Sequence, residues 1–85
     1  MLLNETLELV RKLIDKCDVD NIEILLSDEY LHCPEEEKCE PEFDLRIKET
    51  LYHSQIQRID EVLSEYSNVE MRMSSDGLEI YEVEA

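Results

Sequence analysis

The side chains best suited to bind a metal lie close together in the middle of the chain. His32, Cys33 and Cys39 supply the nitrogen and sulfur ligands that Zn²⁺ prefers. A structural zinc site needs four such ligands, usually from paired C-x-x-C knuckles, and this spacing does not provide them. The third cysteine, Cys17, falls on the apolar face of a predicted helix. We therefore treat His32, Cys33 and Cys39 as weak candidates for metal ligands. We interpret all three cysteines as reduced thiols and expect no cofactor.

Catalytic groups are less well supported than metal ligands. Cys33 follows His32, but adjacent residues rarely point at each other, and the acidic surroundings disfavour a thiolate. Gly77 is the only glycine, so the chain has no glycine-rich loop to hold a phosphate. The abundant carboxylates form no pair in clearly different environments, which acid–base catalysis needs. We expect the protein not to be an enzyme.

Charge is the strongest constraint on the partner. Asp and Glu number 23 against 8 Lys and Arg, which gives a net charge of −15 over 85 residues. A chain this acidic is repelled by bare nucleic acid and by anionic membrane surfaces, and it is attracted to basic protein surfaces. We therefore expect a partner with a basic surface, such as a nucleic-acid-binding protein, and no direct contact with nucleic acid or membrane.

One function that fits this charge is an acidic decoy. Carboxylates on a rigid scaffold would occupy the positive groove of a nucleic-acid-binding protein, attracted over long range and held by its Arg and Lys side chains. In size and charge alone, the chain resembles phage-encoded DNA mimics and anti-defence inhibitors, and this resemblance implies an inhibitor of the phage or mobile-element type. The expected partner-binding carboxylates are Glu35, Glu36, Glu37, Glu40, Glu42 and Asp44 in a loop, with Asp60, Glu61 and Glu65 on a helix.

Two other functions remain open. In the first, the chain is a small protein-interaction module, an accessory subunit or a homodimer, and its acidity only maintains solubility. The interface would then be the first helix, because residues 1–17 contain three acids and three bases, or the edge of the sheet. Salt separates this alternative from the decoy, since many ion pairs weaken steeply with ionic strength and an apolar interface does not. The second is a weak metal-binding protein.

The N-terminal half of the chain predicts a helix, a strand, an acidic loop and a second strand. Residues 2–17 carry apolar side chains at steps of three and four, which predicts an amphipathic helix with Asn4 as its N-cap. Residues 22–26 predict a short strand buried on one face or on both. The prolines and glutamates of residues 28–42 indicate an exposed acidic loop. Residues 43–48 alternate as in a strand, although they could also begin a longer helix. The apolar side of the first helix comprises Leu3, Leu7, Val10, Leu13, Ile14 and Cys17.

The C-terminal half predicts a second helix followed by a hairpin. Residues 49–66 return to a helical period, with Tyr52 and Leu63 on its apolar face. Two alternating segments flank Asp76 and Gly77, a pair typical of a hairpin turn. The sequence therefore predicts one small α+β domain over residues 1–85, with two amphipathic helices packed on a mostly antiparallel sheet in the order α-β-β-α-β-β. With neither a membrane-spanning apolar run nor a signal-peptide pattern, we expect a cytoplasmic protein.

Overall fold

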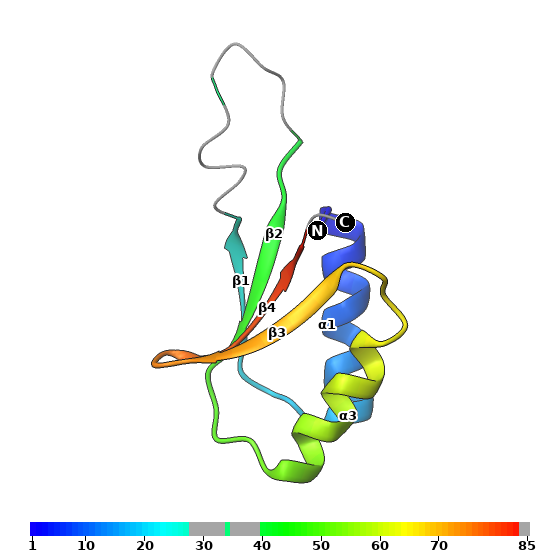
Figure 1. Cartoon of the computed structure of the whole chain (residues 1–85), viewed down its shortest axis with the longest axis vertical. Coiled ribbons are helices and arrows are strands. Elements are labelled where there is room, and N and C mark those ends of the chain that lie inside the picture. Colours follow the sequence, from blue (N-terminus) through cyan, green and yellow to red (C-terminus); the bar gives the residue numbers. More distant parts are fainter. Residues whose placement is uncertain (28–33, 35–39, 84–85) are drawn as a thin grey trace.

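A computed structural model describes residues 1–27, 34 and 40–83, which form two helices and one four-stranded antiparallel sheet (Figure 1). The predicted α+β class and element order are confirmed. Residues 43–47, whose pattern also allowed a helix, form a strand. In chain order the elements are α1 (Leu3–Cys17), β1 (Ile22–Leu26), β2 (Phe43–Ile47), α3 (His53–Leu63), β3 (Val69–Ser74) and β4 (Gly77–Glu82).

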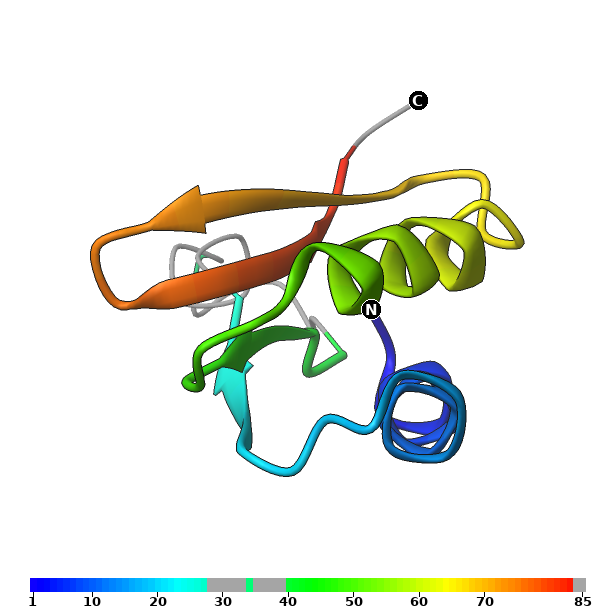
Figure 2. The ribbon, with the colours of Figure 1, turned by 90° about the horizontal axis from the view of Figure 1, so that it is seen from below.

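The strands lie in the order β1-β2-β4-β3, so β4, the last of the four described strands in sequence, lies inside the sheet. Leu45 of β2 is the register partner of both Ile24 in β1 and Ile80 in β4, and Met71 of β3 also pairs with Ile80. Partners in an antiparallel sheet project to the same face, so these four side chains share one face. Both helices lie against that face, as Figure 2 shows from below, and no helix of the described residues covers the opposite, open face of the sheet.

The core lies between the two helices and the inner strands. Leu13 of α1, Leu45 and Ile47 of β2, Ile59 of α3 and Ile80 of β4 are all 0% exposed. Helix α1 contacts α3 and β2, whereas α3 contacts α1 and β3. The first strand, β1, therefore lies at the margin of the sheet, outside the best-covered part of the core.

The start of α1 is set by the main chain of Met1. Its α-amino group donates to the Phe43 carbonyl over 3.1 Å, and the Phe43 N–H donates back to the Met1 carbonyl over 2.7 Å. This strand-like pairing places the helix start at Leu3, with Leu2 at the N-cap and no side-chain cap hydrogen bond. The prediction that Asn4 caps the helix is wrong, because that residue already lies within α1.

The second helix is shorter than predicted at both ends. Glu49 lies outside it, and its carboxylate accepts the backbone N–H groups of Asp20 and Asn21 over 2.7 and 3.1 Å. Tyr52, predicted on the apolar face, is instead the N-cap residue and is 74% exposed. Its N–H donates to the Gln55 side-chain oxygen over 2.9 Å, which satisfies one of the donors left open at a helix start. Residues 49–52 therefore join the sheet to α3.

The predicted hairpin is confirmed, with its turn one residue earlier than the Asp-Gly pair suggests. Ser74 and Gly77 are register partners, so Ser75 and Asp76 form the two-residue turn and Gly77 begins β4. Gly77 has a φ of 130°, and a Cβ at this position would collide with the Ile47 carbonyl oxygen. Glycine is required here because β4 approaches the end of β2 so closely.

Much of the predicted acidic loop at residues 28–42 lies outside the described residues. In the part of the chain that is described, neither helix is long and apolar enough to cross a membrane.

Candidate protein interface

The loop carboxylates predicted to bind a partner are only partly placed. Glu40 is exposed before β2, and Glu42 is half-buried, its main-chain carbonyl accepting the Ser27 N–H over 2.9 Å. Asp44 is half-buried in β2, on the open face of the sheet. The other predicted loop residues lie outside the described part of the chain: Glu35, Glu36 and Glu37, and the weak metal candidates His32, Cys33 and Cys39.

The helical carboxylates lie on the other layer of the molecule. Asp60 and Glu61 are exposed on α3, and Glu65 follows the helix. The Lys12 ammonium group donates to Glu65 over 3.1 Å and lies 5.0 Å from the centre of the Tyr66 ring. This hydrogen bond holds the pKa of the Glu65 carboxyl below its usual range and raises the pKa of Lys12. Glu65 is therefore part of the contact between α1 and α3.

The predicted carboxylates do not form one surface among the described residues. Residues 40–44 lie in the upper part of the view in Figure 1, and α3 lies in the lower part. Asp44 also projects from the open face of the sheet, whereas Asp60 and Glu61 belong to the helix layer on the other face. Their arrangement gives no support of its own to the decoy hypothesis, which stays a prediction from charge.

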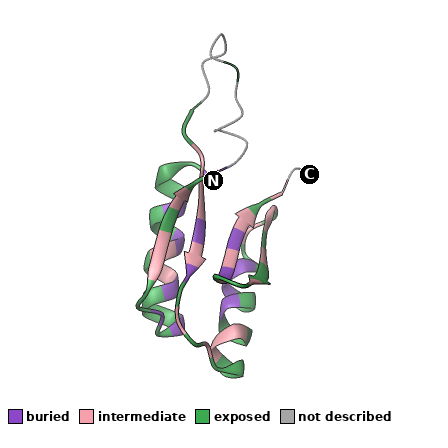
Figure 3. Ribbon diagram, turned by 90° about the vertical axis from the view of Figure 1, so that its left-hand side faces the viewer, coloured by how far each residue is buried: buried purple, intermediate pink, exposed green. Residues whose placement is uncertain are grey.

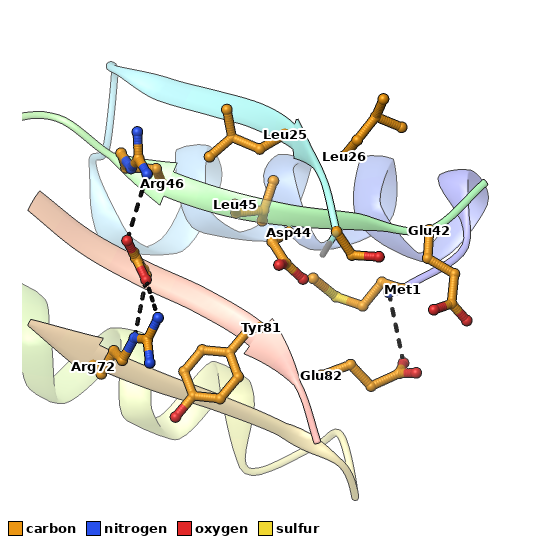
Figure 4. A pocket seen from close by; sticks show the side chains of 12 residues that line it. Met1, Leu25, Leu26, Glu42, Asp44, Leu45, Arg46, Arg72, Tyr81 and Glu82 are labelled. Carbon is orange, nitrogen blue, oxygen red and sulfur yellow. Dashed lines mark hydrogen bonds and ion pairs between the residues drawn. The ribbon is translucent and has the colours of Figure 1, made fainter. Parts of the chain in front are cut away.

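A row of alternating charges crosses the open face of the sheet. The Glu79 carboxylate accepts from Arg72 Nε over 2.9 Å and from Arg46 Nη2 over 3.5 Å, as the dashed lines in Figure 4 mark. Glu23 continues the row, its carboxylate 3.7 Å from Arg46 Nη1. The hydrogen bond from Arg72, and to a lesser extent the charge of Arg46, hold the pKa of Glu79 below its usual range. The charges in this row pair with one another across four strands, which stabilises the sheet.

A hollow of about 280 Å³ lies beside this row (Figure 4). Tyr81 forms part of its lining, with the Arg72 guanidinium 5.1 Å from the ring centre, and Leu25 lies across from it on β1. Within residues 1–27, 34 and 40–83, no three His, Cys, Asp or Glu side chains lie close enough together to bind one metal ion. Cys17 is buried in the core, and this burial raises the pKa of its thiol. Neither the hollow nor the buried thiol has the donor set of a metal centre.

Helix α1 has a wider apolar side than the core can cover. Its buried stripe consists of Thr6, Leu9, Leu13 and Cys17. Leu3, Leu7 and Ile14, predicted to belong to the core face, are 47–49% exposed. They lie away from α3, because Lys12 on the other side of the helix makes the contact with Glu65.

Strand β1 adds a second exposed apolar row beside the first. Ile24 and Leu26 project to the helix-covered face, as their register partners Leu45 and Phe43 do, but they are 41% and 45% exposed. The prediction that this strand is well buried is wrong, because β1 is an edge strand and the helices cover mainly the inner strands. In Figures 2 and 3, β1 lies in the sheet and α1 in the helix layer at the same edge of the molecule.

We call these five residues together the apolar flank: Leu3, Leu7 and Ile14 of α1, and Ile24 and Leu26 of β1. At its upper end a hollow of about 330 Å³ is lined by both Leu3 and Phe43. Phe43 is the cross-strand partner of Leu26, so this hollow lies between Leu3 of the helix row and the strand next to β1. Large exposed apolar side chains that gather along one edge of a domain usually mark an interaction site.

The flank is also the electrically neutral part of a strongly acidic chain. Residues 1–17 contain three acids and three bases, so the net charge of −15 belongs to residues 18–85. Glu23, the one charged residue of β1, lies 3.4 Å from Lys48 and 3.7 Å from Arg46. Helix α1 and strand β1 therefore present balanced charges to a partner, whereas the exposed Glu40 lines the hollow at the upper end of the flank.

The sequence contained part of the signal for this surface. It identified the neutral first helix and the sheet edge as possible interfaces, but periodicity alone could not say which apolar residues of residues 2–17 would be left uncovered. That depends on where α3 packs, and the Lys12–Glu65 ion pair that accompanies this packing joins residues 53 positions apart.

Comparison with protein-family models, with curated proteins and with solved structures found no match to this chain.

Proposed function

We propose that this protein is a non-catalytic protein-interaction module that binds another protein chain through the apolar flank. The observation that carries this proposal is the exposure of five large aliphatic side chains, each 41–49% accessible, along one neutral edge of a chain with a net charge of −15. The acidity then keeps the protein soluble and repels wrong partners, while the flank provides the attraction.

The chemistry of the flank favours an apolar partner surface over a basic groove. Its side chains are branched aliphatics, which gain free energy by leaving water and which make no ion pairs. Leu3 and Ile14 lie nearly at opposite ends of α1, so the partner would contact almost the whole helix together with the neighbouring strand. A surface of this shape suits a folded partner that presents its own apolar helix or strand.

Affinity capture with a flank variant tests the proposal. The immobilised wild-type protein and the variant Leu7→Lys/Ile14→Lys are exposed to a lysate of the source cells and eluted with rising salt. A matched control, Ser54→Lys/Gln57→Lys, adds the same two positive charges to the exposed side of α3. We expect the wild type and the control to retain a partner at high salt, and the flank variant to lose it. Equal retention by the flank variant would show that the flank is not the interface.

The same experiment includes the test of the acidic decoy. That function requires a nucleic-acid-binding partner that elutes at moderate salt, because its complex would depend on many ion pairs. Such a partner would be lost when Glu35, Glu36 and Glu37 are changed to Lys and kept when the flank is changed. This result would favour the decoy over the interaction module.

A further inference from the structure

We infer that the partner bound at the apolar flank is a second copy of this chain, joined through antiparallel pairing of the two β1 strands. The inference rests on the proposed function and specifies its partner. It follows from the direction in which the backbone hydrogen-bonding groups of β1 point, from the sequence of this strand and from the distribution of charge.

Alternate backbone N–H and C=O groups of β1 point away from β2 and are placed to bind another strand. The Ser27 N–H donates to the Glu42 carbonyl, and the Lys48 N–H donates to the Asn21 carbonyl. In an antiparallel pair, alternate residues of a strand direct their N–H and C=O groups to the same neighbour, so the odd-numbered residues of β1 direct theirs to β2. The N–H and C=O groups of Ile22, Ile24 and Leu26 therefore point to the outer edge. No strand among the described residues pairs with that edge.

A two-fold axis through Ile24 pairs all of these groups at once. In that register Ile24 lies opposite Ile24 of the second copy, and Ile22 lies opposite Leu26 of the second copy. The same six backbone groups from each copy then form hydrogen bonds across the dyad, and two four-stranded sheets become one continuous sheet. The strand is self-complementary because apolar side chains face apolar side chains throughout its helix-covered face.

The charges on the open face also fit this register. Glu23 would lie opposite Leu25 of the second copy, so within Ile22–Leu26 no two like charges stand directly across the axis. Each Glu23 keeps its own Arg46 and Lys48 within 4 Å. The other free edge, β3, is less suitable, because its exposed side chains include the charged Glu70 and Arg72. Charged side chains of this kind are typical of edge strands that are protected from pairing.

Helix α1 extends the same interface in the second layer. In Figure 2 it lies at the same edge of the molecule as β1, the edge that would face the axis. Pairing of the strands would therefore also bring the two exposed rows of Leu3, Leu7 and Ile14 toward each other. The five flank side chains expose roughly 400 Å² on each copy, which is near the apolar share of an interface of about 800 Å² per partner. The area therefore suits a stable dimer.

Sedimentation velocity over a range of protein concentrations tests this inference with the purified chain alone. We expect the 10.1 kDa protein to form a dimer, with an equilibrium that strengthens with salt because screening reduces the repulsion between two chains of charge −15. Ile24→Lys would place two ammonium groups at the axis and raise the dimer dissociation constant by at least about a hundredfold. Met73→Lys is the matched control, since Met73 is an exposed apolar residue on the same face of the other edge strand, and it should leave the dimer unchanged.

The possible results separate this inference from the proposed function. The circular dichroism spectrum of Ile24→Lys is compared with that of the wild type. If the two spectra match, loss of the dimer in this variant is caused by the changed interface and not by unfolding. A wild-type protein that stays monomeric at about 100 µM, or a dimer lost on Met73→Lys and kept on Ile24→Lys, overturns the homodimer. Either result leaves the interaction module standing, because capture of a different chain by the flank is measured independently.

Discussion

Replacing Glu79 with Gln tests the charged row on the open face of the sheet. The Glu79 side chain is 20% exposed, accepts from Arg72 over 2.9 Å and lies 3.5 Å from Arg46, whose side chain is 24% exposed. A hydrogen bond to a charged group contributes about 1.5–3 kcal/mol, and the 65% exposure of Arg72 reduces its share through solvent screening. We expect Glu79→Gln to lower the free energy of unfolding at pH 7 by about 1–2 kcal/mol.

The pH dependence of this loss identifies its cause. The pKa of Glu79 is lower in the folded chain than in the unfolded chain, so its stabilising contribution is complete above the unfolded-state value of about 4.3. As the pH falls through the folded-state pKa, the wild-type carboxyl becomes protonated and this contribution disappears. The difference in stability between the wild type and Glu79→Gln should therefore shrink below about pH 4.

Urea denaturation at several pH values between 7 and 3 measures both effects. Glu70→Gln is the matched control, because it removes an exposed carboxylate from the same face of the sheet and should change stability by less than about 0.5 kcal/mol. A loss at pH 7 no larger than that of the control, or a loss that stays constant down to pH 3, would refute the assigned role of Glu79.

Three further predictions concern the core and the hairpin. Leu63→Ala should lower the free energy of unfolding by about 2–5 kcal/mol in urea denaturation, because Leu63 is 4% exposed against the sheet, and a change below about 0.5 kcal/mol would contradict its burial. Gly77→Ala should cost about 2–3 kcal/mol in the same assay, because a Cβ there meets the Ile47 carbonyl at a positive φ, and unchanged stability would disprove this close approach. In a Cys33→Ser/Cys39→Ser background, the Cys17 thiol should react with a thiol reagent only as fast as the chain opens, because it is 0% exposed and its pKa is raised by burial, and a reaction as fast as that of the unfolded chain would contradict the core assignment.

The sequence predicted the helices, strands and hairpin because each has a local signal. Apolar spacing is sufficient for α1 and α3, and alternation between polar and apolar residues is sufficient for β3 and β4. The errors occur where a distant residue decides the local structure. Asn4 is no cap because Met1 pairs with Phe43, and Glu49 is not helical because its carboxylate binds the backbone N–H groups of Asp20 and Asn21.

The candidate interface was predictable only in outline for the same reason. The neutrality of residues 1–17 follows from the sequence, and it indicates the first helix as a possible interface. The exposure of Ile24 and Leu26 does not follow from the sequence, because an edge strand and an inner strand can have the same sequence pattern. Only the strand order β1-β2-β4-β3 shows which of the two this strand is.

The place of β4 in the sheet has a consequence for the synthesis of the protein. Strand β2 pairs with β4 on its inner side, yet β4 is the last of the four described strands to be synthesised, and β3 pairs with β4 alone among them. The sheet therefore cannot close until residue 82 has been made, and the contacts that complete it join distant parts of the chain. Until then the inner edge of β2 has no strand to pair with. The negative charges carried by residues 18–42 are in place before that time, and they keep nascent chains apart during the interval in which the chain is most prone to aggregate.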